Sequence, residues 1–170
     1  QHSISDCYKG GKIYSNEEIE SSLEEYIKKD ITVDQFLDEE ELTKKIVNLL
    51  IDNKVIALFQ KESEIGPRAL GNRSLIASPV LKEMKNILNK IKSRENFRPV
   101  APIVLNEHKS EWFDIEKESP FMLFSVKCKN PDKIPSAIHA DQTSRIQTIT
   151  KENGYVYNIL LEFYNRTKIP

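Results

Sequence analysis

Cysteine is scarce in this chain, and its scarcity excludes several kinds of site. Only two cysteines occur among the 170 residues, Cys7 and Cys128, and neither belongs to a CxxC motif or to a cysteine-histidine pair at metal-binding spacing. A disulfide framework is not needed, because a domain of this length buries roughly 70% of the surface that its unfolded chain exposes. We therefore expect no metal bound by this chain and a reducing, cytoplasmic location.

Long apolar runs and a targeting segment are also missing. The apolar run at residues 55–59 is far too short to cross a bilayer. No basic segment followed by an apolar one stands at the N-terminus, so the sequence predicts no secretory signal and no membrane contact. With 39% hydrophobic and 30% charged residues, the composition indicates one globular domain.

The net charge of -1 combines two unlike segments. Residues 17–41 hold eleven acidic and two basic side chains, whereas residues 61–98 hold nine basic and four acidic ones. A basic segment is often only a solvated face, so position and residue type must decide whether it binds an anion. Of the two segments, residues 61–98 are the better candidate for an anion site.

The chain is expected to divide into a connector and one domain. Residues 1–14 contain Gly10-Gly11 and no apolar period, so they are interpreted as a connector from a missing N-terminal domain. Residues 15–170 form the domain. Because Ile169-Pro170 has the character of the start of an apolar strand, we expect this domain to be cut short at its C-terminal end.

Helical and strand patterns alternate along the domain, which predicts an α/β fold. Ser15 with Glu18, and Asp38 with Glu41, are capping pairs that predict two helix starts. A third helix is expected after Ser78-Pro79. The other predicted elements are helices at residues 107–113 and 155–167, strands at residues 54–60, 100–105, 121–126 and 144–150, and a loop at residues 61–77.

The most unusual segment is residues 64–74, which we call the glycine motif. Two of only five glycines, Gly66 and Gly71, bracket Pro-Arg-Ala-Leu, as a loop requires when its backbone bends tightly and approaches a ligand. Arg68 and Arg73 each carry a planar fork of five donors that matches phosphate or carboxylate oxygens. The alternative is a surface turn with two exposed arginines, which leaves the rigid frame around Arg68 unexplained.

Residues 92–102, the arginine motif, carry Lys92, Arg94 and Arg98 where a helix end meets a strand. Two prolines stiffen this junction, so it is a candidate anion clamp. Cations also favour a helix C-terminus, a gain of roughly 0.3–1 kcal/mol each. That alternative can account for Lys92 but not for Arg98, which lies beyond the helix.

Residues 139–148, the histidine motif, combine His139 and Asp141 with Arg145 and Gln147. On a continuous strand the side chains of Arg145 and Gln147 would share one face. His139 is the side chain most apt to titrate near neutral pH, and Asp141 could orient it or occupy a turn. The alternative is a polar turn without a role in catalysis.

Aromatic residues elsewhere fit a core better than a base-stacking surface. Trp112 and Phe113 follow a run of charged residues, residues 119–124 include an apolar stretch, and such side chains are more often core. Within the last segment, residues 119–122 read Ser-Pro-Phe-Met, which we call the serine-proline motif.

Taken in order, the glycine, arginine, serine-proline and histidine motifs resemble those of the carbamoyltransferase C-terminal family, which occurs in O-carbamoyltransferases of the nodulation and antibiotic-tailoring type. The resemblance extends from about Ser15 to the last residue. Members of that family pair an actin-like, metal-dependent N-terminal domain with a YrdC-like domain. By resemblance, this chain is the YrdC-like domain, an α+β fold with a twisted mixed sheet flanked by helices.

The resemblance also implies ligands and partners. In that family this domain converts carbamoyl phosphate and ATP into a carbamoyl-adenylate, and the N-terminal domain transfers the carbamoyl group to a hydroxyl of an acceptor. The implied cofactors are ATP, with carbamoyl phosphate as co-substrate, Mg²⁺ for ATP and an iron-type metal on the N-terminal domain. The implied partners are small molecules and that N-terminal domain, without nucleic acid or membrane, and a homodimer is compatible with the resemblance.

The same resemblance assigns roles to individual residues. Lys92 and Arg94 correspond to the Lys-x-Arg that contacts phosphates in YrdC-like folds, and Arg145 joins them as a catalytic candidate. The candidates for binding ATP or carbamoyl phosphate are Arg68, Arg73, Arg98, His139, Asp141 and Gln147. Fixed cations in a partly dehydrated pocket stabilise charge on a transferring phosphoryl or adenylyl group.

The chain departs from the family pattern at several positions. Lys61-Glu62 stands where the family usually has Gly-Arg, so one expected phosphate contact is left without its arginine. Val100 replaces a Phe, and Ala140, Gln142 and Ser144 replace Val, Gly and Ala. The Leu-Asn-Thr-Ser-Phe-Asn run that follows this point in the family is absent from the sequence, so the isolated chain is expected to bind weakly or not turn over.

Two other functions remain open at this point. The first is a basic-cleft nucleic-acid-binding module, because a YrdC-like fold presents a concave basic surface. Against it, the basic residues here lie at Gly-Pro and Pro-framed positions rather than along a face with interleaved aromatics. The second is a non-catalytic domain that only shapes the site of the partner domain. A nucleotide-binding assay separates the three.

Overall fold

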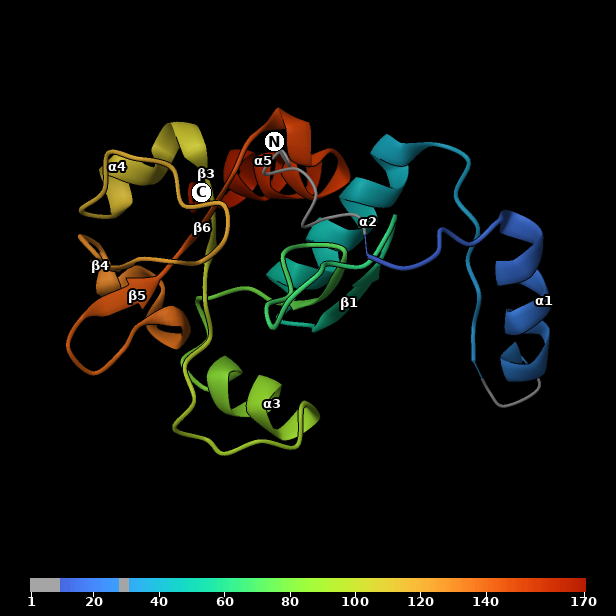
Figure 1. Cartoon of the computed structure of the whole chain (residues 1–170), viewed down its shortest axis with the longest axis horizontal. Helices are drawn as coiled ribbons and strands as arrows, with labels where there is room; N and C mark the ends of the chain where they lie inside the picture. The colour runs from blue at the N-terminus through green and yellow to red at the C-terminus, as the bar shows by residue number, and fades with distance from the viewer. Residues whose placement is uncertain (1–9, 28–30) are drawn as a thin grey trace.

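The computed structural model describes residues 10–27 and 31–170, so most of the connector predicted at residues 1–14 lies outside the described residues. Figure 1 shows helices and strands interspersed along the chain. The helices are α1 (Asn16–Ile27), α2 (Glu39–Ile51), α3 (Met84–Ile91), α4 (Lys109–Trp112) and α5 (Tyr155–Thr167). The strands are β1 (Ile56–Phe59), β2 (Arg73–Ile76), β3 (Ile103–Leu105), β4 (Ser125–Lys127), β5 (Thr143–Arg145) and β6 (Gln147–Ile149).

The first two helices begin at the predicted capping residues. At α1 the Ser15 N–H donates to the Glu18 carboxylate at 3.0 Å, and the Glu18 N–H donates to the Ser15 hydroxyl at 3.3 Å. At α2 the Asp38 carboxylate accepts from the Glu40 N–H at 2.9 Å, and not from Glu41, the predicted partner. These oxygens satisfy backbone donors that have no partner inside the helix, and so they define where each helix starts.

Among residues 10–27 and 31–170, the larger of two apolar cores forms where α2 and α5 pack together against β1 and β3. Val47 and Leu50 of α2 and Phe163 of α5 are buried there with Leu105 and Ile149. Burial of each such side chain stabilises the fold by about 1.5–3 kcal/mol. Helix α5 has the predicted bounds, because its apolar residues recur at helical spacing after a glycine turn.

A second core lies beneath α4, β4 and the segment that leads into β6. It contains Trp112, Phe113, Val104 and Ile146, all of them buried. Trp112 and Phe113 are therefore core residues, as the sequence predicts, and their rings are not available for stacking on a base.

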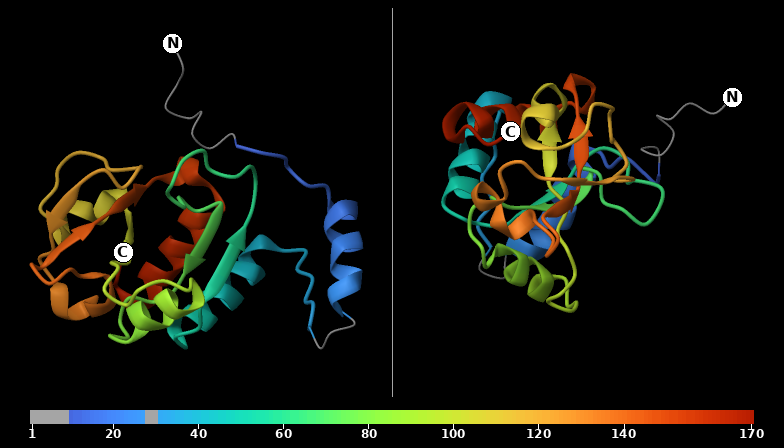
Figure 2. Two further views of the ribbon diagram at one scale, coloured as in Figure 1. Left: turned by 60° about the horizontal axis from the view of Figure 1, so that its bottom comes forward. Right: turned by 90° about the vertical axis from the view of Figure 1, so that its left-hand side faces the viewer.

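The strands form three two-stranded sheets within the described residues. The β1–β2 and β4–β5 pairs are antiparallel, whereas β3 and β6 are parallel, with Ile103 opposite Gln147. In Figure 1 and in the left view of Figure 2, the β3–β6 pair lies between a part formed by α4, β4 and β5 and a part formed by α2, α5 and β1. The fold is therefore α+β, and its parallel and antiparallel pairings are divided over three short sheets.

Several boundaries differ from the sequence predictions. The strand predicted at residues 100–105 begins only at Ile103, and the one predicted at residues 121–126 begins only at Ser125, because residues 120–122 form a turn and a bend. Residues 61–77, predicted as a loop, contain β2, which pairs with the preceding strand, β1. Helix α3 begins at Met84 instead of after Ser78-Pro79, because turns precede it and Glu83, at its N-cap, makes no side-chain cap. The strand predicted at residues 144–150 is divided at Ile146, since β5 pairs with β4 while β6 pairs with β3.

Candidate functional site

Gln147 is the point at which three of the four motifs meet. Its side-chain amide donates to the Leu70 carbonyl of the glycine motif at 2.9 Å, across a separation of 77 positions. Its backbone N–H donates to the Pro102 carbonyl of the arginine motif at 2.9 Å. Gln147 is fully buried, so both hydrogen bonds are shielded from water. The start of β6 therefore holds the glycine and arginine motifs against the histidine motif.

The serine-proline motif is attached to the residues on either side of Gln147. The Ser119 N–H donates to the Thr148 hydroxyl at 2.7 Å, and the Ser119 hydroxyl donates to the Ile146 carbonyl at 3.0 Å. The Thr148 N–H donates back to the Ser119 carbonyl at 3.0 Å. All four motifs that carry the family resemblance are thus attached to residues 146–148.

The expectation that Arg145 and Gln147 share one face is wrong. The chain changes sheets at Ile146, so the alternation of a single continuous strand does not continue through it. Arg145 is exposed on β5, whereas Gln147 is buried at the start of β6. Gln147 therefore contacts the glycine motif, and Arg145 faces solvent.

The glycine motif is closed by a carboxylate. Oε1 of Glu64 accepts from the N–H groups of Leu70 at 2.7 Å, Asn72 at 2.8 Å and Arg73 at 3.3 Å. Burial alone would raise the pKa of Glu64, but these backbone hydrogen bonds together outweigh it and hold the pKa below its usual value. The motif is therefore an arch whose base is fastened by Glu64.

The two arginines of the glycine motif have different surroundings. The guanidinium of Arg73 donates to the carbonyls of Gln60 at 2.5 Å, Asn72 at 3.1 Å and Lys61 at 3.0 Å, and it stacks 3.6 Å from the ring of Phe59. It thereby ties β1 to the arch. The half-buried Arg68 side chain makes no hydrogen bond or ion pair within the described residues, so its donors are available to a ligand.

The arginine motif is ordered by a buried asparagine on α3. The side-chain amide of Asn89 donates to the carbonyls of Asn96 at 3.2 Å and Arg98 at 2.9 Å, and its oxygen accepts from Nε of Arg94 at 2.5 Å. Asn89 is fully buried. Arg98 itself is exposed and pairs with Glu95 at 2.7 Å. The loop that carries the cations is thus pinned to the helix that precedes it.

Arg94 keeps donors that the protein does not use. Its Nη2 group reaches the Pro99 carbonyl at 3.4 Å, and its Nη1 group has no partner within the described residues.

Partial desolvation, and then the nearby charge of Arg94, lower the pKa of Lys92. Lys90, Arg94 and their neighbours on this loop line an open surface depression. Lys92 and Arg145 are exposed, and the side chain of neither makes a hydrogen bond or ion pair within residues 10–27 and 31–170.

His139 and Asp141 are linked through a hydroxyl. The Thr143 hydroxyl donates to Oδ1 of Asp141 at 2.7 Å and lies 3.0 Å from Nδ1 of His139. Since the hydroxyl has one proton, which goes to Asp141, Nδ1 of His139 is the donor in the second contact. Hydrogen bonds from the Thr143 hydroxyl and backbone N–H lower the pKa of Asp141. Asp141 therefore occupies a turn and orients His139 indirectly.

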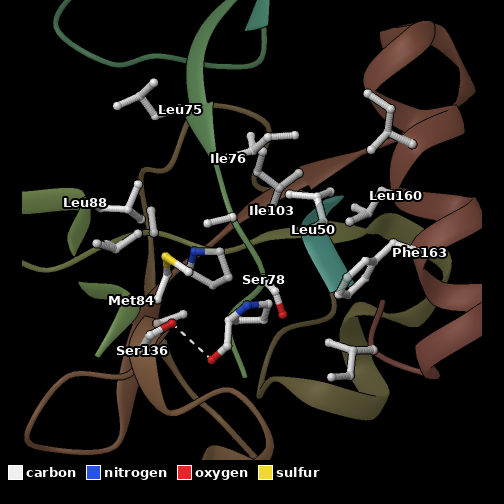
Figure 3. A pocket seen from close by; sticks show the side chains of 18 of the residues that line it. Leu50, Leu75, Ile76, Ser78, Met84, Leu88, Ile103, Ser136, Leu160 and Phe163 are labelled. Carbon is white, nitrogen blue, oxygen red and sulfur yellow. Dashed lines mark hydrogen bonds between the residues drawn. The ribbon is translucent and has the colours of Figure 1, made fainter. Parts of the chain in front are cut away.

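An apolar cavity of about 120 Å³ lies beside these motifs, between α3, α5 and residues 100–103. Figure 3 shows Met84 and Leu88 on one side and Phe163 on the other, with the Ser136 hydroxyl donating to the Pro79 carbonyl at 3.0 Å. Its lining is almost wholly apolar, so a phosphate would lose its hydration there without gaining a charged partner. The cavity is not the anion site.

Residues 10–27 and 31–170 include no group of three or more histidine, cysteine or carboxylate side chains that could hold a metal ion. No helix in the described part of the chain has the length and apolar character needed to span a bilayer.

Two residues important to this arrangement carry no role in the sequence predictions. Glu64 belongs to the glycine motif, and Asn89 lies on α3 between Leu88 and Lys90. Asn89 is fully buried. A polar residue that satisfies buried carbonyls cannot be told from a solvated one by helical spacing alone. For Glu64, the sequence signal that could have indicated a role is its position at the start of a loop bracketed by glycines.

These contacts define an α+β domain in which four separate motifs are fastened to one strand, β6. Residues 47–170 match the family described as carbamoyltransferase C-terminus. The chain belongs to this family.

Several curated relatives are similar to the chain. It is 41% identical over 129 residues to nodulation protein U of Sinorhizobium fredii, an alignment that covers 74% of this chain and 23% of that protein. It is 40% identical over 172 residues to an uncharacterized protein of Methanocaldococcus jannaschii, covering 98% and 33%. With nodulation protein NolO of Bradyrhizobium diazoefficiens it shares 34% over 138 residues, covering 77% and 25%. The chain thus spans about a quarter to a third of the length of these relatives.

Two departures from the family pattern occur where the backbone suits glycine. Lys61 and Gln142, which by the resemblance stand where the family has glycines, have φ angles of 47° and 63°. Side chains with a Cβ are disfavoured in this left-handed region. At both positions the backbone therefore keeps the conformation that glycine favours, although the residue there has a Cβ.

Two further replacements also have a structural context. Ser144, which replaces an alanine, is fully buried and donates to the Ala137 carbonyl at 2.6 Å, so its hydroxyl is satisfied. Val100, which replaces a phenylalanine, lines the apolar cavity.

Proposed function

We propose that this chain is the C-terminal domain of a two-domain carbamoyltransferase, which binds carbamoyl phosphate and ATP and forms a carbamoyl-adenylate. Water cleaves carbamoyl phosphate into carbamate and inorganic phosphate. A carbamate oxygen then attacks the α-phosphorus of ATP, and pyrophosphate leaves. In the final transfer, the hydroxyl oxygen of an acceptor attacks the carbamoyl carbon, the hydroxyl loses its proton and AMP leaves. The partner in that step is an actin-like N-terminal domain with an iron-type metal.

The observation that carries the proposal is the attachment of the cation-bearing motifs to one strand through Gln147. Both reactants are polyanions, and Arg68, Lys92 and Arg145 have cationic groups that the protein leaves without partners among the described residues. Arg94 is held by Asn89 through Nε and still offers Nη1. Donors that are fixed before the ligand arrives stabilise transferring phosphates without further reorganisation.

The remaining assignments are part of the same proposal. Lys92, Arg94 and Arg145 act on the transferring groups, and Arg68 and Arg98 contact phosphates. His139, Asp141 and Gln147 shape the site from the histidine motif, while Arg73 mainly holds the arch that carries Arg68. Mg²⁺ accompanies ATP. The reactants are intracellular metabolites, which fits a cytoplasmic enzyme.

The test is the Arg94→Lys variant of the protein at its full natural length. Lysine keeps the charge but loses the planar fork, so carbamoyl phosphate-dependent release of pyrophosphate from ATP should fall by about ten- to a hundredfold. Arg166→Lys, at an exposed position near the end of α5, is the matched control and should keep the parent rate. Thermal melts check that both variants fold.

Each alternative function predicts a different result. An unchanged rate and an unchanged melt for Arg94→Lys would remove Arg94 from the site. If neither ATP nor carbamoyl phosphate raises the melting temperature of the parent protein, the proposal is wrong, because a ligand that binds only the native state must stabilise it. A single-stranded oligonucleotide that raises it instead would support the nucleic-acid alternative.

A further inference from the structure

The arch of the glycine motif is fastened at its base and free along its span. Within the described part of the chain, no hydrogen bond involves residues 65–69, the five-residue span that contains Arg68. Gly66 and Gly71 have φ angles of 121° and 116°, which residues with a Cβ rarely adopt. The direction in which Arg68 points therefore depends on how the two ends of the span are joined.

Glu64 supplies that junction. Its Oε1 atom accepts three backbone N–H groups from the far side of the arch, those of Leu70, Asn72 and Arg73, at 2.7, 2.8 and 3.3 Å. A carboxylate oxygen is suited to this task, because its charge strengthens each hydrogen bond and it can accept several at once. Shortening or neutralising the side chain would loosen all three contacts together.

The far side of the arch is held from outside as well. Gln147 donates to the Leu70 carbonyl at 2.9 Å, and Gln60 donates to the Gly71 carbonyl at 2.9 Å. The Gly71 N–H donates to the Ser74 hydroxyl at 2.9 Å. Residues 70–74 are therefore a fixed platform. Glu64 attaches the near end of the span to these fixed residues.

The charge of Glu64 is directed at the backbone and not at the arginine. No ion pair joins Glu64 to Arg68 within the described residues, although both belong to the same short motif. A carboxylate paired with Arg68 would compete with an anionic ligand. Because neither carboxylate oxygen of Glu64 pairs with Arg68 within the described residues, the guanidinium of Arg68 stays available.

From these contacts we infer that Glu64 is the positioning residue for Arg68: its carboxylate closes the arch and presents the arginine to the anion. The inference rests on the proposed function, because it needs Arg68 to contact ATP or carbamoyl phosphate. Glu64 touches neither reactant and takes no part in bond making.

A double-mutant cycle in the full-length protein tests the inference, with ATP and carbamoyl phosphate affinities measured by titration calorimetry. Glu64→Gln should weaken binding of the reactant that Arg68 contacts by about tenfold, the equivalent of one charge-assisted hydrogen bond. Arg68→Ala should weaken it at least as much. In the Arg68→Ala background, Glu64→Gln should have no further effect on affinity, because positioning acts only through Arg68.

A purely structural role predicts a different pattern. Tyr157→Phe is the matched control, since it removes a 2.7 Å hydrogen bond from Tyr157 to the Glu107 carboxylate at a position outside all four motifs. It should lower the melting temperature and leave both affinities unchanged. If it weakens binding as Glu64→Gln does, general loosening explains both variants and the inference is wrong.

The outcomes separate the inference from the function. If Arg68→Ala weakens binding but Glu64→Gln does not, or if the effect of Glu64→Gln persists in the Arg68→Ala background, the inference fails and the proposed function stands. If Arg68→Ala changes neither affinity, Arg68 does not contact the reactants and both statements about it fail. Should Glu64→Gln not fold, Glu64→Asp keeps the charge and shortens the reach, and the same cycle is read with that variant.

Discussion

Oδ1 of Asn89 accepts a hydrogen bond from Nε of Arg94 at 2.5 Å, while the amide of the same asparagine holds the carbonyls of Asn96 and Arg98. One fully buried side chain on α3 thus sets the path of the loop that follows the helix. The uncharged side chain of Asn89 thus fixes the position of the Arg94 guanidinium.

Asn89→Ala should therefore be strongly destabilising. It removes three part-buried hydrogen bonds together, two to carbonyls and one from the arginine Nε, which costs about 2–4 kcal/mol of unfolding free energy. Chemical denaturation measures the loss. Asn86→Ala, one turn earlier on the exposed side of α3, is the control and should change stability by no more than about 0.5 kcal/mol. Equal effects for the two variants would contradict the role assigned to Asn89.

The contact between Gln147 and Leu70 predicts a difference between two glutamines. Gln147→Leu leaves the Leu70 carbonyl unpaired in a buried place and should cost about 1–3 kcal/mol of unfolding free energy. Gln60→Leu removes the contact to the adjacent Gly71 carbonyl from a half-buried position, where water can replace it, and should cost less. Urea unfolding of the two variants gives the comparison, and a larger loss for Gln60→Leu would refute it.

Substitution of Lys61 or Gln142 by glycine should stabilise the fold. A residue with a Cβ at positive φ costs about 1–2 kcal/mol, whereas glycine adds an entropic cost of about 0.5–1 kcal/mol to folding. The steric saving is the larger, so Lys61→Gly and Gln142→Gly should each raise the unfolding free energy by about 0.5–1 kcal/mol. Lys61→Ala keeps the Cβ and should bring no such gain. If alanine and glycine behave alike at position 61, backbone strain is not the cause.

The lowered pKa of Glu64 predicts how stability depends on pH. A carboxylate whose folded-state pKa lies below its usual value of 4.5 stabilises the fold above that value, and its contribution is lost as the pH falls through the folded pKa. The difference in unfolding free energy between the parent and Glu64→Gln should thus be constant near neutral pH and shrink in acid. Thermal unfolding from pH 7 to pH 3 measures it. A difference that stays constant over this range would show that the carboxylate charge is not involved.

Much of the local structure could be predicted from the sequence, because the responsible interactions lie within one helical turn. The Ser15–Glu18 and Asp38–Glu40 contacts place the starts of α1 and α2. The apolar spacing of α5 gives its bounds. The family resemblance likewise rests on short stretches of residues, and the family match over residues 47–170 confirms it.

The partners of the buried polar side chains were decided only by the tertiary structure. Whether Gln147 faces solvent depends on the change of sheet at Ile146, and that change depends on pairing with β3 and β4, far away in the sequence. Asn89 and Glu64 look like ordinary surface residues until the carbonyls and N–H groups they satisfy are in place. A buried hydrogen bond needs both of its groups brought together by the fold, so its partner cannot be read from the spacing around either one.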